Sequence, residues 1–264
     1  MSKIKVIDVS AWQGTINWKK VKEDGYIGAI IKCGGSDDGF YTDSKFEYNY
    51  KYAKEAGLKV GCYYFAGKNF GKNPEADAAT EFKAWERIIH GKFFELPIFI
   101  DIEVQPYEQK KGTTDAIIKL GELFENNNYF FGVYGSEVST FEDRVEKDRL
   151  ERFAWWVASY SRSAPSIPWI GWQKSSTGSV SGIEGNVDIN SFEDISDVII
   201  KNKMNGFSSY PTVKNDPELV HIVKPGETLS GIAAEAGTNW QTLRNINHLT
   251  NPNLIYPGQK IKLR

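Results

Sequence analysis

The stretch Leu96-Pro-Ile-Phe-Ile-Asp-Ile-Glu103 decides the fold that we predict for this chain. Its apolar, β-branched and aromatic residues predict a strand buried on both faces, which ends abruptly in Asp101 and Glu103. Side chains two residues apart on a strand share a face, so the two carboxyl groups lie side by side at its carboxyl end. Repulsion and lost hydration there raise a carboxyl pKa, which keeps an acid protonated near neutral pH. The alternative is a strand that runs into solvent with two ordinary surface acids.

The composition is that of a soluble globular protein with an unusually high aromatic share. Of the 264 residues, 41% are hydrophobic, 25% are charged and 14% are aromatic. Aromatic excess is typical of proteins that bind the faces of sugars, rings or peptides, although cores use aromatics too. The net charge of -2 gives no large field, so neither nucleic acid nor a membrane surface is predicted as a partner.

The sequence shows no signal for export or membrane insertion, and it has few cysteines. Residues 1–8 contain no apolar segment of a signal peptide, and no stretch approaches transmembrane length. We therefore expect a chain made in the cytoplasm, without a signal peptide and without membrane insertion. Cys33 and Cys62 are the only cysteines, and both lie in strand-like runs, which favours free buried thiols over a disulfide framework or a zinc site.

Strand-like and helix-like segments alternate over the first two thirds of the chain. The predicted strands are 4–9, 28–33, 59–65, 96–103, 129–134, 153–159, 171–174 and 187–192, and the predicted helices are 18–24, 43–56, 74–89, 113–126 and 138–149. Eight strands alternating with helices predict an α/β fold with a closed parallel barrel. Because the last third is poor in helices, we predict an irregular (β/α) TIM-like barrel. An open doubly wound sheet is the alternative, but no glycine-rich phosphate fingerprint follows the first strand.

The composition then shifts, which divides the chain into domains. Residues 1–202 form the predicted barrel domain, and residues 203–219, rich in Pro, Asn, Ser and Gly, form a linker. Residues 220–264 form a small βααβ domain, with strands at 221–223 and 260–263 and helices at 228–235 and 239–246. This domain carries a net charge of +3, whereas the rest of the chain carries -5.

Four acids, Asp8, Asp101, Glu103 and Asp188, lie at ends of predicted barrel strands. The carboxyl ends of parallel strands converge on one mouth of a barrel, and its first and last strands are neighbours, so Asp8 and Asp188 should lie close together. Such a cluster is costly unless protons or cations are handled there. His90 is the one histidine in this domain and falls on a helix, so a magnesium or calcium site made of carboxylates is the metal alternative. We predict acid and base work by carboxylates, with no metal and no cofactor.

Aromatic residues also gather near the predicted strand ends. They are Trp12, Tyr64, Tyr134, Trp156, Tyr160 and Trp172, the last beside Gln173. Each alone is more often part of a core, but together with carboxylates at a barrel mouth they predict a groove for sugar rings. A glycosidase needs this combination, because one carboxylic acid protonates the leaving oxygen and one carboxylate stabilises the oxocarbenium-like centre.

In its order of motifs, the barrel domain resembles the family 25 glycoside hydrolases. The motifs are Asp8-Val-Ser, Trp12-Gln-Gly, Ile30-Ile-Lys32, Gly61 to Phe65, Asp101-Ile-Glu103, Trp156-Val-Ala-Ser-Tyr160, Trp172-Gln173 and Val187-Asp-Ile-Asn190. The resemblance covers residues 4 to 195. It implies an irregular barrel and the activity of a lysozyme, a 1,4-β-N-acetylmuramidase that cleaves bacterial peptidoglycan with retention.

The resemblance also implies roles for individual residues. Glu103 is expected to be the acid/base and Asp101 its partner, with Asp8 and Asp188 as the other active-site acids. Substrate-binding residues are expected at Trp12, Tyr64, Tyr134, Trp156 and Gln173. The sequence departs from the family at Cys33-Gly-Gly, where members more often have Ala-Thr-Glu-Gly, so contacts from that loop are not carried over.

Residues 220–264 resemble a LysM module. The motifs are His221-Ile-Val-Lys-Pro-Gly-Glu-Thr-Leu-Ser-Gly-Ile-Ala, residues 239–247 and Asn251-Pro-Asn-Leu-Ile-Tyr-Pro-Gly-Gln-Lys-Ile. LysM modules bind glycans that contain N-acetylglucosamine, between the loop after the first strand and the loop before the last. The implied binding residues are Gly226, Glu227, Thr228, Leu229, Asn253, Leu254 and Ile255. The alternative is that these residues cap helices and turn the chain.

The sequence thus predicts a muramidase tethered to a wall-binding module, of the phage endolysin type. The alternatives are a bacterial autolysin of the same activity, a catalytically weak peptidoglycan- or chitin-binding protein, and a chitinase-like enzyme. Two routes to retention stay open, because either the 2-acetamido group of the substrate or Asp101 can attack the anomeric carbon. Since Asp101 and Glu103 are expected on one side of the sugar, and direct attack needs acid and nucleophile on opposite sides, we favour substrate assistance.

Overall fold

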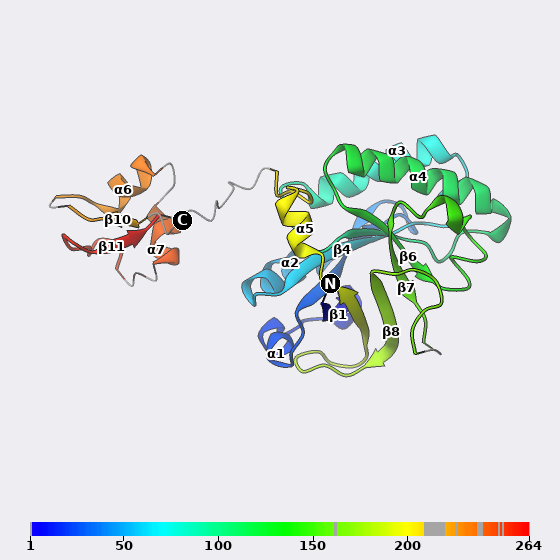
Figure 1. The fold of residues 1–264 in the computed structure, drawn as a ribbon, viewed down its shortest axis with the longest axis horizontal. Helices are drawn as coiled ribbons and strands as arrows, with labels where there is room; N and C mark the ends of the chain where they lie inside the picture. Colours follow the sequence, from blue (N-terminus) through cyan, green and yellow to red (C-terminus); the bar gives the residue numbers. More distant parts are fainter. Residues whose placement is uncertain are drawn as a thin grey trace. The chain divides into compact units, whose positions relative to one another are not determined.

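The protein forms two compact units, Met1–Ser209 and Tyr210–Arg264. The computed structural model describes residues 2–160, 163–208, 220–224, 226–236, 240–247, 249 and 251–263. Figure 1 shows the first unit as strands with helices over part of their outside, and the second as a small group of helices and strands.

A closed barrel of eight strands forms the first unit. Its strands are β1 (Lys3–Val9), β2 (Gly28–Gly35), β4 (Lys59–Phe65), β5 (Ile98–Asp101), β6 (Phe131–Ser136), β7 (Ala154–Ala158), β8 (Gly171–Gly178) and β9 (Val187–Glu193). The order is β1-β9-β8-β7-β6-β5-β4-β2, and a parallel pairing of β2 with β1 closes the barrel. The short β3 (Tyr41–Thr42) adds to the end of β2. All eight predicted strands are confirmed, and the open doubly wound sheet is excluded.

The direction of β9 differs from the prediction of a parallel barrel. β9 runs antiparallel to both of its neighbours, β8 and β1, and Asp188 lies directly opposite Asp8. The reason is the connection, since residues 179–186 form no helix, and strands joined by a short connection pair in antiparallel fashion. The start of β9, and Asp188 with it, therefore lies at the carboxyl ends of the parallel strands.

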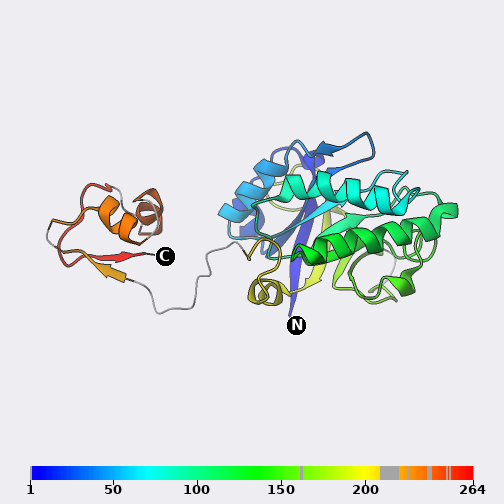
Figure 2. The same cartoon turned by 90° about the horizontal axis from the view of Figure 1, so that it is seen from above.

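Helices cover the outside of the barrel. They are α1 (Trp18–Glu23), α2 (Phe46–Glu55), α3 (Pro74–Ile89), α4 (Lys110–Asn126) and α5 (Ser196–Lys201). The two longest, α3 and α4, lie side by side (Figure 2). Pro74 starts α3 as predicted, because the first turn of a helix has no use for its missing N–H.

The predicted helix at 138–149 is wrong. The segment consists of turns and one 3₁₀ turn, η3 (Lys147–Arg149). Its side chains bond to backbone groups instead: the Thr140 hydroxyl donates to the Ile102 carbonyl at 2.6 Å, and Arg144 donates to the carbonyls of Gln105 and Ser139. These bonds offer the backbone an alternative to a helix and hold the loop against the end of β5.

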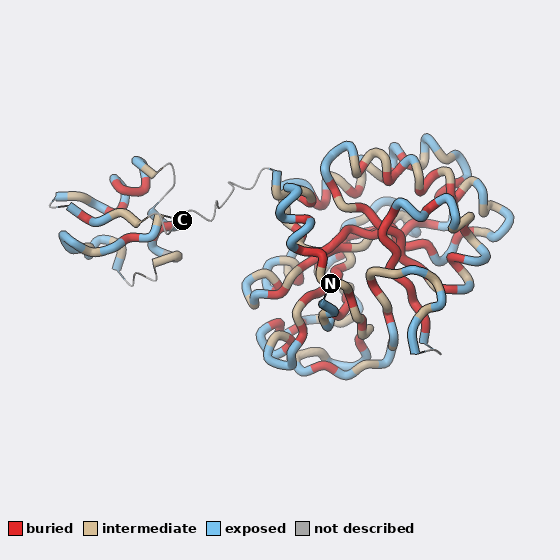
Figure 3. Tube along the Cα trace, in the orientation of Figure 1, coloured by how far each residue is buried: buried red, intermediate tan, exposed pale blue. Residues whose placement is uncertain are grey.

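Two apolar layers, one inside the barrel and one between barrel and helices, fix which way each strand residue points. The inner layer includes Val6, Ile30, Leu96, Phe99, Tyr134, Trp156 and Phe192. The outer layer includes Ile7, Ile31, Cys62, Tyr64, Trp85 and Phe124. Figure 3 shows buried segments inside the first unit, and β5 and β7 are buried along their whole length. Gly132 leaves room for the inner layer, because a Cβ there would meet the Phe99 ring at 2.6 Å.

Both cysteines are free and buried, as predicted. They lie in the outer layer on neighbouring strands, β2 and β4. The Cys33 thiol donates to the Tyr63 carbonyl at 3.1 Å, beside a β-bulge that interrupts the pairing between residues 32 and 34.

The predicted start of the linker, residue 203, is wrong. Asn205 is fully buried; its side chain donates to the carbonyls of Phe94 and Leu96 and accepts from the Phe130 backbone N–H. These bonds satisfy backbone groups at the bottom of the barrel, so residues up to at least 205 belong to it. The rest of the predicted linker, residues 209–219, lies outside the described residues.

The second unit has the predicted βααβ order. β10 (Val220–Ile222) pairs in antiparallel fashion with β11 (Lys260–Lys262), and α6 (Leu229–Glu235) and α7 (Trp240–Ile246) lie between them in sequence. Val223, Leu229, Ile232, Leu243 and Ile261 form its core. Residue 239, the predicted start of the second helix, is not among the described residues.

Within the described residues, no helix combines the length and apolarity needed to cross a membrane.

Candidate active site

The barrel mouth brings together all four acids that the sequence predicted. Asp8 is the last but one residue of β1, Asp101 is the last residue of β5, and Asp188 lies at the start of β9. We had predicted that Glu103 belongs to the same strand as Asp101, but it lies in the bend that follows β5. The Thr140 bond to the Ile102 carbonyl ties this bend to the next loop.

Asp8 and Asp188 form a pair of carboxyl groups across the β1–β9 ladder. Asp8 is buried, and its Oδ2 accepts from Asn190 Nδ2 at 2.7 Å and from Gln173 Nε2 at 3.0 Å. Desolvation by burial, followed by the charge of Asp188, holds the pKa of Asp8 well above its usual range. Desolvation also raises the pKa of Asp188, while its hydrogen bond with Asp8 lowers it. The pair therefore favours one proton, held mainly by Asp8.

Asp101 and Glu103 differ in exposure, although they are only two residues apart. Asp101 is 3% exposed, and its Oδ1 has no hydrogen-bond partner among the described residues. Burial first, and then the charge of Glu103, raises its pKa well above the usual range. Glu103 opens to the cleft, but the walls of the mouth limit its hydration, and this desolvation raises its pKa. Both groups thus favour the protonated form more than ordinary carboxyl groups do.

Lys32 is a charged group of the mouth that we had not predicted as a site residue. It lies on β2, and its charge acts to lower the pKa of both Asp101 and Glu103. Its ammonium group lies 4.7 Å from the centre of the Phe65 ring, a cation–π distance. The signal was available in the alternation of β2, because Lys32 shares a face with the inward-pointing Ile30. Lys32 thus acts on both acids, and Arg144 adds a second positive charge that acts on Glu103.

Tyr134 and Trp156 lie inside the barrel below the acids. Their ring centroids are 4.2 Å apart, and the Tyr134 hydroxyl donates to Gln173 Oε1 at 2.9 Å. The same hydroxyl lies within hydrogen-bonding reach of Glu103, whose pKa it acts to lower, but with one proton it donates either to Gln173 or to Glu103. Trp156 is only 1% exposed, so it forms the floor of the site and offers no open face to a sugar, contrary to our prediction.

The prediction for Tyr64 is wrong by one residue. Tyr64 is fully buried in the outer layer, where its ring stacks on Trp85 with centroids 5.3 Å apart. Its neighbour Tyr63 points into the barrel, and the charges of Asp8 and Asp101 help to raise its pKa, after burial. Because neighbours on a strand point to opposite faces, the aromatic residue of β4 in the site is Tyr63.

Two aromatic side chains at the mouth are open to solvent. Trp12 is 90% exposed and lies in the 3₁₀ turn η1 (Ala11–Gln13), which a capping box between Ser10 and Gln13 holds in place. Tyr160 is 56% exposed and follows β7. These two rings, rather than Tyr64 and Trp156, can offer faces to a sugar.

A cleft leads away from Glu103. It has a volume of about 570 Å³, and its lining residues include Glu103, Tyr134, Val138, Ser159 and Tyr160. Its walls are the loops after β6 and β7. The cleft thus joins the exposed acid to a space large enough for part of a bound chain.

Gln173 takes the place predicted for it but is closed to solvent. Its Nε2 donates to Asp8, and its Oε1 accepts from Tyr134 at 2.9 Å and from Tyr160 at 2.5 Å. It links the Asp8–Asp188 pair to the two tyrosines. Asn190, which the sequence analysis quoted only as part of a motif, makes the second bond to Asp8.

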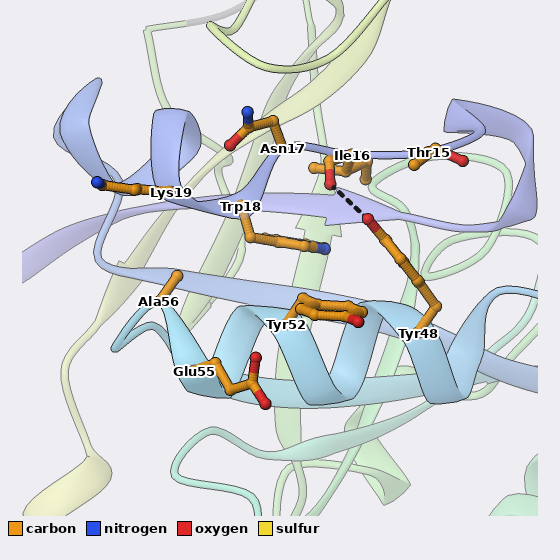
Figure 4. Close-up of a pocket in the computed structure, with 9 residues that line it drawn as sticks. All are labelled: Thr15, Ile16, Asn17, Trp18, Lys19, Tyr48, Tyr52, Glu55 and Ala56. Carbon is orange, nitrogen blue, oxygen red and sulfur yellow. Dashed lines mark hydrogen bonds between the residues drawn. The ribbon is translucent and has the colours of Figure 1, made fainter. Parts of the chain in front are cut away.

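Outside the mouth, the described residues of the barrel unit offer neither a metal-binding group nor a pair of acids in the pocket beside α2. Among the described residues, no group of three or more His, Cys, Asp or Glu side chains is arranged to hold a metal ion. A pocket of about 470 Å³ lies outside the barrel between residues 15–19 and α2 (Figure 4). There the Tyr48 hydroxyl donates to the Ile16 carbonyl at 3.2 Å, and Glu55 is the one acid that lines the pocket. A lone acid cannot perform paired acid and base chemistry.

In the second unit, the two predicted loops face a common pocket. It has a volume of about 570 Å³ and is lined by Glu227, Thr228, Leu229, Ser230, Trp240, Pro252, Asn253 and Ile255. Gly226 and Leu254 do not line it, although Leu254 is exposed. Leu229 is also part of the core, Thr228 caps α6, and the Glu227 carboxylate bonds His221 and the Lys224 backbone. Trp240 is the aromatic residue of the pocket that we had not predicted.

Comparisons with known proteins agree with this geometry. The model of the Glycosyl hydrolases family 25 matches residues 7–183, and the LysM domain model matches residues 221–264. Lysozyme M1 of Streptomyces globisporus is 32% identical over 212 residues, which cover 72% of this chain and 68% of the lysozyme. The autolytic lysozyme of Clostridium acetobutylicum is 28% identical over 193 residues, which cover 72% of this chain and 56% of the relative.

A solved structure extends the comparison to the fold. The CTP1L endolysin superposes with a TM-score of 0.64 at 25% identity, over 74% of this chain and 69% of the endolysin. The family match spans well over half of the chain and contains Asp8, Asp101 and Glu103. The chain therefore belongs to the glycosyl hydrolases family 25 and carries a LysM domain after its barrel.

Proposed function

We propose that the barrel is a 1,4-β-N-acetylmuramidase that cleaves peptidoglycan between N-acetylmuramic acid and N-acetylglucosamine. The observation that carries the proposal is the partly desolvated Glu103 at the open end of a cleft, beside the buried Asp101. A carboxyl group with a raised pKa can protonate the leaving oxygen near neutral pH. The names of the two curated relatives, both lysozymes, support this substrate.

Analysis of the new reducing ends tests the proposal. Purified bacterial walls are digested with the full chain, reduced with borohydride and hydrolysed. Reduced muramic acid is expected, and no signal is expected from Glu103→Gln. Reduced glucosamine would contradict a muramidase, and cleavage of chitin oligomers would favour the chitinase-like alternative. No release at all would favour the glycan-binding protein.

For the mechanism, we propose retention with help from the 2-acetamido group of the substrate. The support is the burial of Asp101, because an acid that is 3% exposed is poorly placed to attack a sugar carbon, whereas attack by the acetamido oxygen of the substrate needs no nucleophile from the protein. Because Glu103 lies beyond β5, the two acids do not share a strand as predicted. A sugar adduct on Asp101, trapped and seen by mass spectrometry, would exclude the mechanism.

For the second unit, we propose binding of glycans that contain N-acetylglucosamine in the pocket between its two loops. Trp240 offers an aromatic side chain that is 39% exposed, and Asn253 lies on the opposite loop. Isothermal titration of the full chain carrying Glu103→Gln with N-acetylglucosamine oligomers tests this. Trp12→Ala and Tyr160→Ala remove the exposed rings of the barrel mouth and should weaken binding there. Trp240→Ala, added to these two substitutions, should abolish the binding that remains.

For the biological role, we propose an endolysin. The likeness to the CTP1L endolysin supports it, and the likeness to an autolytic lysozyme keeps the autolysin as the alternative. An endolysin produced inside bacteria should lyse them only after another protein has opened the membrane. Lysis without such help would favour an autolysin with its own route of export.

A further inference from the structure

Two side-chain amides converge on a single oxygen atom of Asp8. Asn190 on β9 and Gln173 on β8 both donate to Oδ2, at 2.7 and 3.0 Å. Asp8, Asn190 and Gln173 are all buried, so water does not compete for these bonds. An oxygen that already accepts two N–H groups is a poor place for a proton. A proton on Asp8 is therefore directed to the other oxygen, Oδ1.

The orientation of each amide is set by aromatic donors behind it. The Trp156 indole N–H donates to Asn190 Oδ1 at 2.8 Å. Because an indole N–H cannot accept a hydrogen bond, the Asn190 NH₂ group must face Asp8. The hydroxyls of Tyr134 and Tyr160 both donate to Gln173 Oε1, which leaves the Gln173 NH₂ group for Asp8 in the same way.

We propose that Asn190 and Gln173 are positioning residues that make Asp8 and Asp188 work as a pair with one proton, held on Asp8 and donated toward Asp188. Asp188 is then the carboxylate that faces the substrate. The inference rests on the proposed glycosidase function of this site. It assigns to Gln173 a task other than the sugar contact expected from the sequence.

The charges around Asp8 agree with this arrangement. Asp188 on β9 lies directly opposite, Asp101 on β5 lies across the barrel, and Lys32 on β2 is the cation that acts on Asp101. The hydroxyls of Tyr63, Tyr134 and Tyr160 are neutral, since their pKa values are raised above the ordinary value. Burial raises the pKa of Asp8, whereas the amides of Asn190 and Gln173 lower it. Burial therefore outweighs the amides and keeps the proton on Asp8, while the amides decide which of its two oxygens carries that proton.

The single proton matters for the reaction. Positive charge develops at the anomeric centre, and a fixed carboxylate beside it stabilises that charge without reorganisation. A pair with two protons would supply no such charge, while a pair with none would be costly to hold in a buried site. By directing the Asp8 proton toward Asp188, whose pKa that hydrogen bond lowers, the amides set the range of pH over which Asp188 stays negative.

The test is the pH profile of kcat/KM on short soluble glycans. Asn190→Leu removes one donor at similar size and should move the acidic limb to higher pH by about half to one unit, the effect of one lost hydrogen bond to a carboxyl group. The alkaline limb, which belongs to Glu103, should stay in place. Gln173→Met should move the acidic limb in the same direction. A fall in kcat/KM that is equal at every pH would overturn the proposal, because it would show a merely structural role.

A measurement on the unsubstituted protein covers the case in which these variants do not fold. Carboxyl carbon-13 NMR should show Asp8 and Asp188 titrating in two coupled steps, with Asp8 keeping its proton to the higher pH. Two independent titrations at ordinary aspartate pKa values would overturn the proposal. This measurement does not depend on cleavage, so a chain that fails to cut peptidoglycan would contradict the proposed function while the titration still decides the inference.

Discussion

Glu103 and Asp101 show how two identical functional groups acquire different tasks. Asp101 is enclosed at the end of β5, whereas Glu103 lies beyond the strand, where the chain bends into the cleft. The Tyr134 hydroxyl and the Lys32 charge both act to lower the pKa of Glu103, but desolvation outweighs them. The exposed acid can exchange its proton with a leaving group, and the enclosed acid cannot.

Glu103→Gln should abolish lysis of bacterial walls while leaving folding and wall binding intact, because it removes one proton donor and keeps the shape. The loss should be at least about a hundredfold in kcat. Turbidity of a wall suspension measures lysis, and pelleting with walls measures binding. Near-native lysis by this variant would mean that another group is the acid.

Asp101→Asn should stabilise the fold at pH 7, because it removes a buried acid whose Oδ1 lacks a partner among the described residues. The folded-state pKa of Asp101 is raised, so its contribution to stability is fully present below the unfolded-state pKa of about 3.9 and is lost as the pH rises through the folded-state pKa. We expect the Tm at pH 7 to rise by about 3 °C, and the gain to vanish near pH 3.

The control for this prediction is Asp115→Asn on the surface. Asp115 bonds Lys111 and Arg149, which lower its pKa, so its stabilising effect is present above its unfolded-state pKa and is lost on acidification. Its replacement should leave the Tm at pH 7 unchanged or slightly lower. Calorimetry at both pH values compares the two variants, and a Tm that falls for Asp101→Asn at pH 7 would contradict the prediction.

At the scale of elements, alternation along a strand decides which side chains meet the substrate. β4 places Tyr63 inside the barrel and Tyr64 against Trp85 on α3. Both are aromatic and both lie near the carboxyl end of the strand, so composition does not distinguish them. The direction of a strand matters too. Because β9 is antiparallel to β1, the start of β9, and not its end, lies at the mouth.

Tyr63→Phe and Tyr64→Phe form a matched pair of variants on neighbouring positions. Tyr63→Phe should lower kcat/KM on soluble glycans by about tenfold, because it removes a hydroxyl that lies near Asp8 and Asp101 and can bond the substrate. Tyr64→Phe should leave kcat/KM within about twofold, because that side chain lies in the outer layer. Steady-state kinetics and the Tm of each variant provide the comparison. A larger loss for Tyr64→Phe would mean that the outer layer controls the site.

At the scale of the whole molecule, the proposed catalytic residues and the proposed glycan-binding pocket belong to different units. The acids lie in the first unit, and the pocket of Trp240 and Asn253 lies in the second. A tether raises the local concentration of substrate without changing the chemistry. The two units can therefore be tested apart.

Deletion of residues 220–264 should weaken retention on walls by at least about tenfold but change kcat/KM on short soluble glycans by less than about twofold. Co-sedimentation measures retention, and release of reducing ends measures cleavage. Trp240→Ala in the full chain is the matched control, because it should weaken retention without removing the unit. Equal losses on both substrates would mean that the second unit completes the active site.

The order of the eight strands, the four acids and the βααβ order of the second unit could be predicted from the amino-acid sequence. Those features depend on local patterns, namely apolar runs, turn residues and charged strand ends, which each segment carries in its own composition. The tertiary structure alone decided that β9 is antiparallel, that Tyr63 rather than Tyr64 faces the acids, and that Lys32 and Asn190 join them. These outcomes depend on pairing and register between strands distant in sequence, where a shift of one residue exchanges the two faces. Asn205 is a further case, because a polar residue in an apparent linker is buried only once the barrel supplies the backbone groups that it bonds.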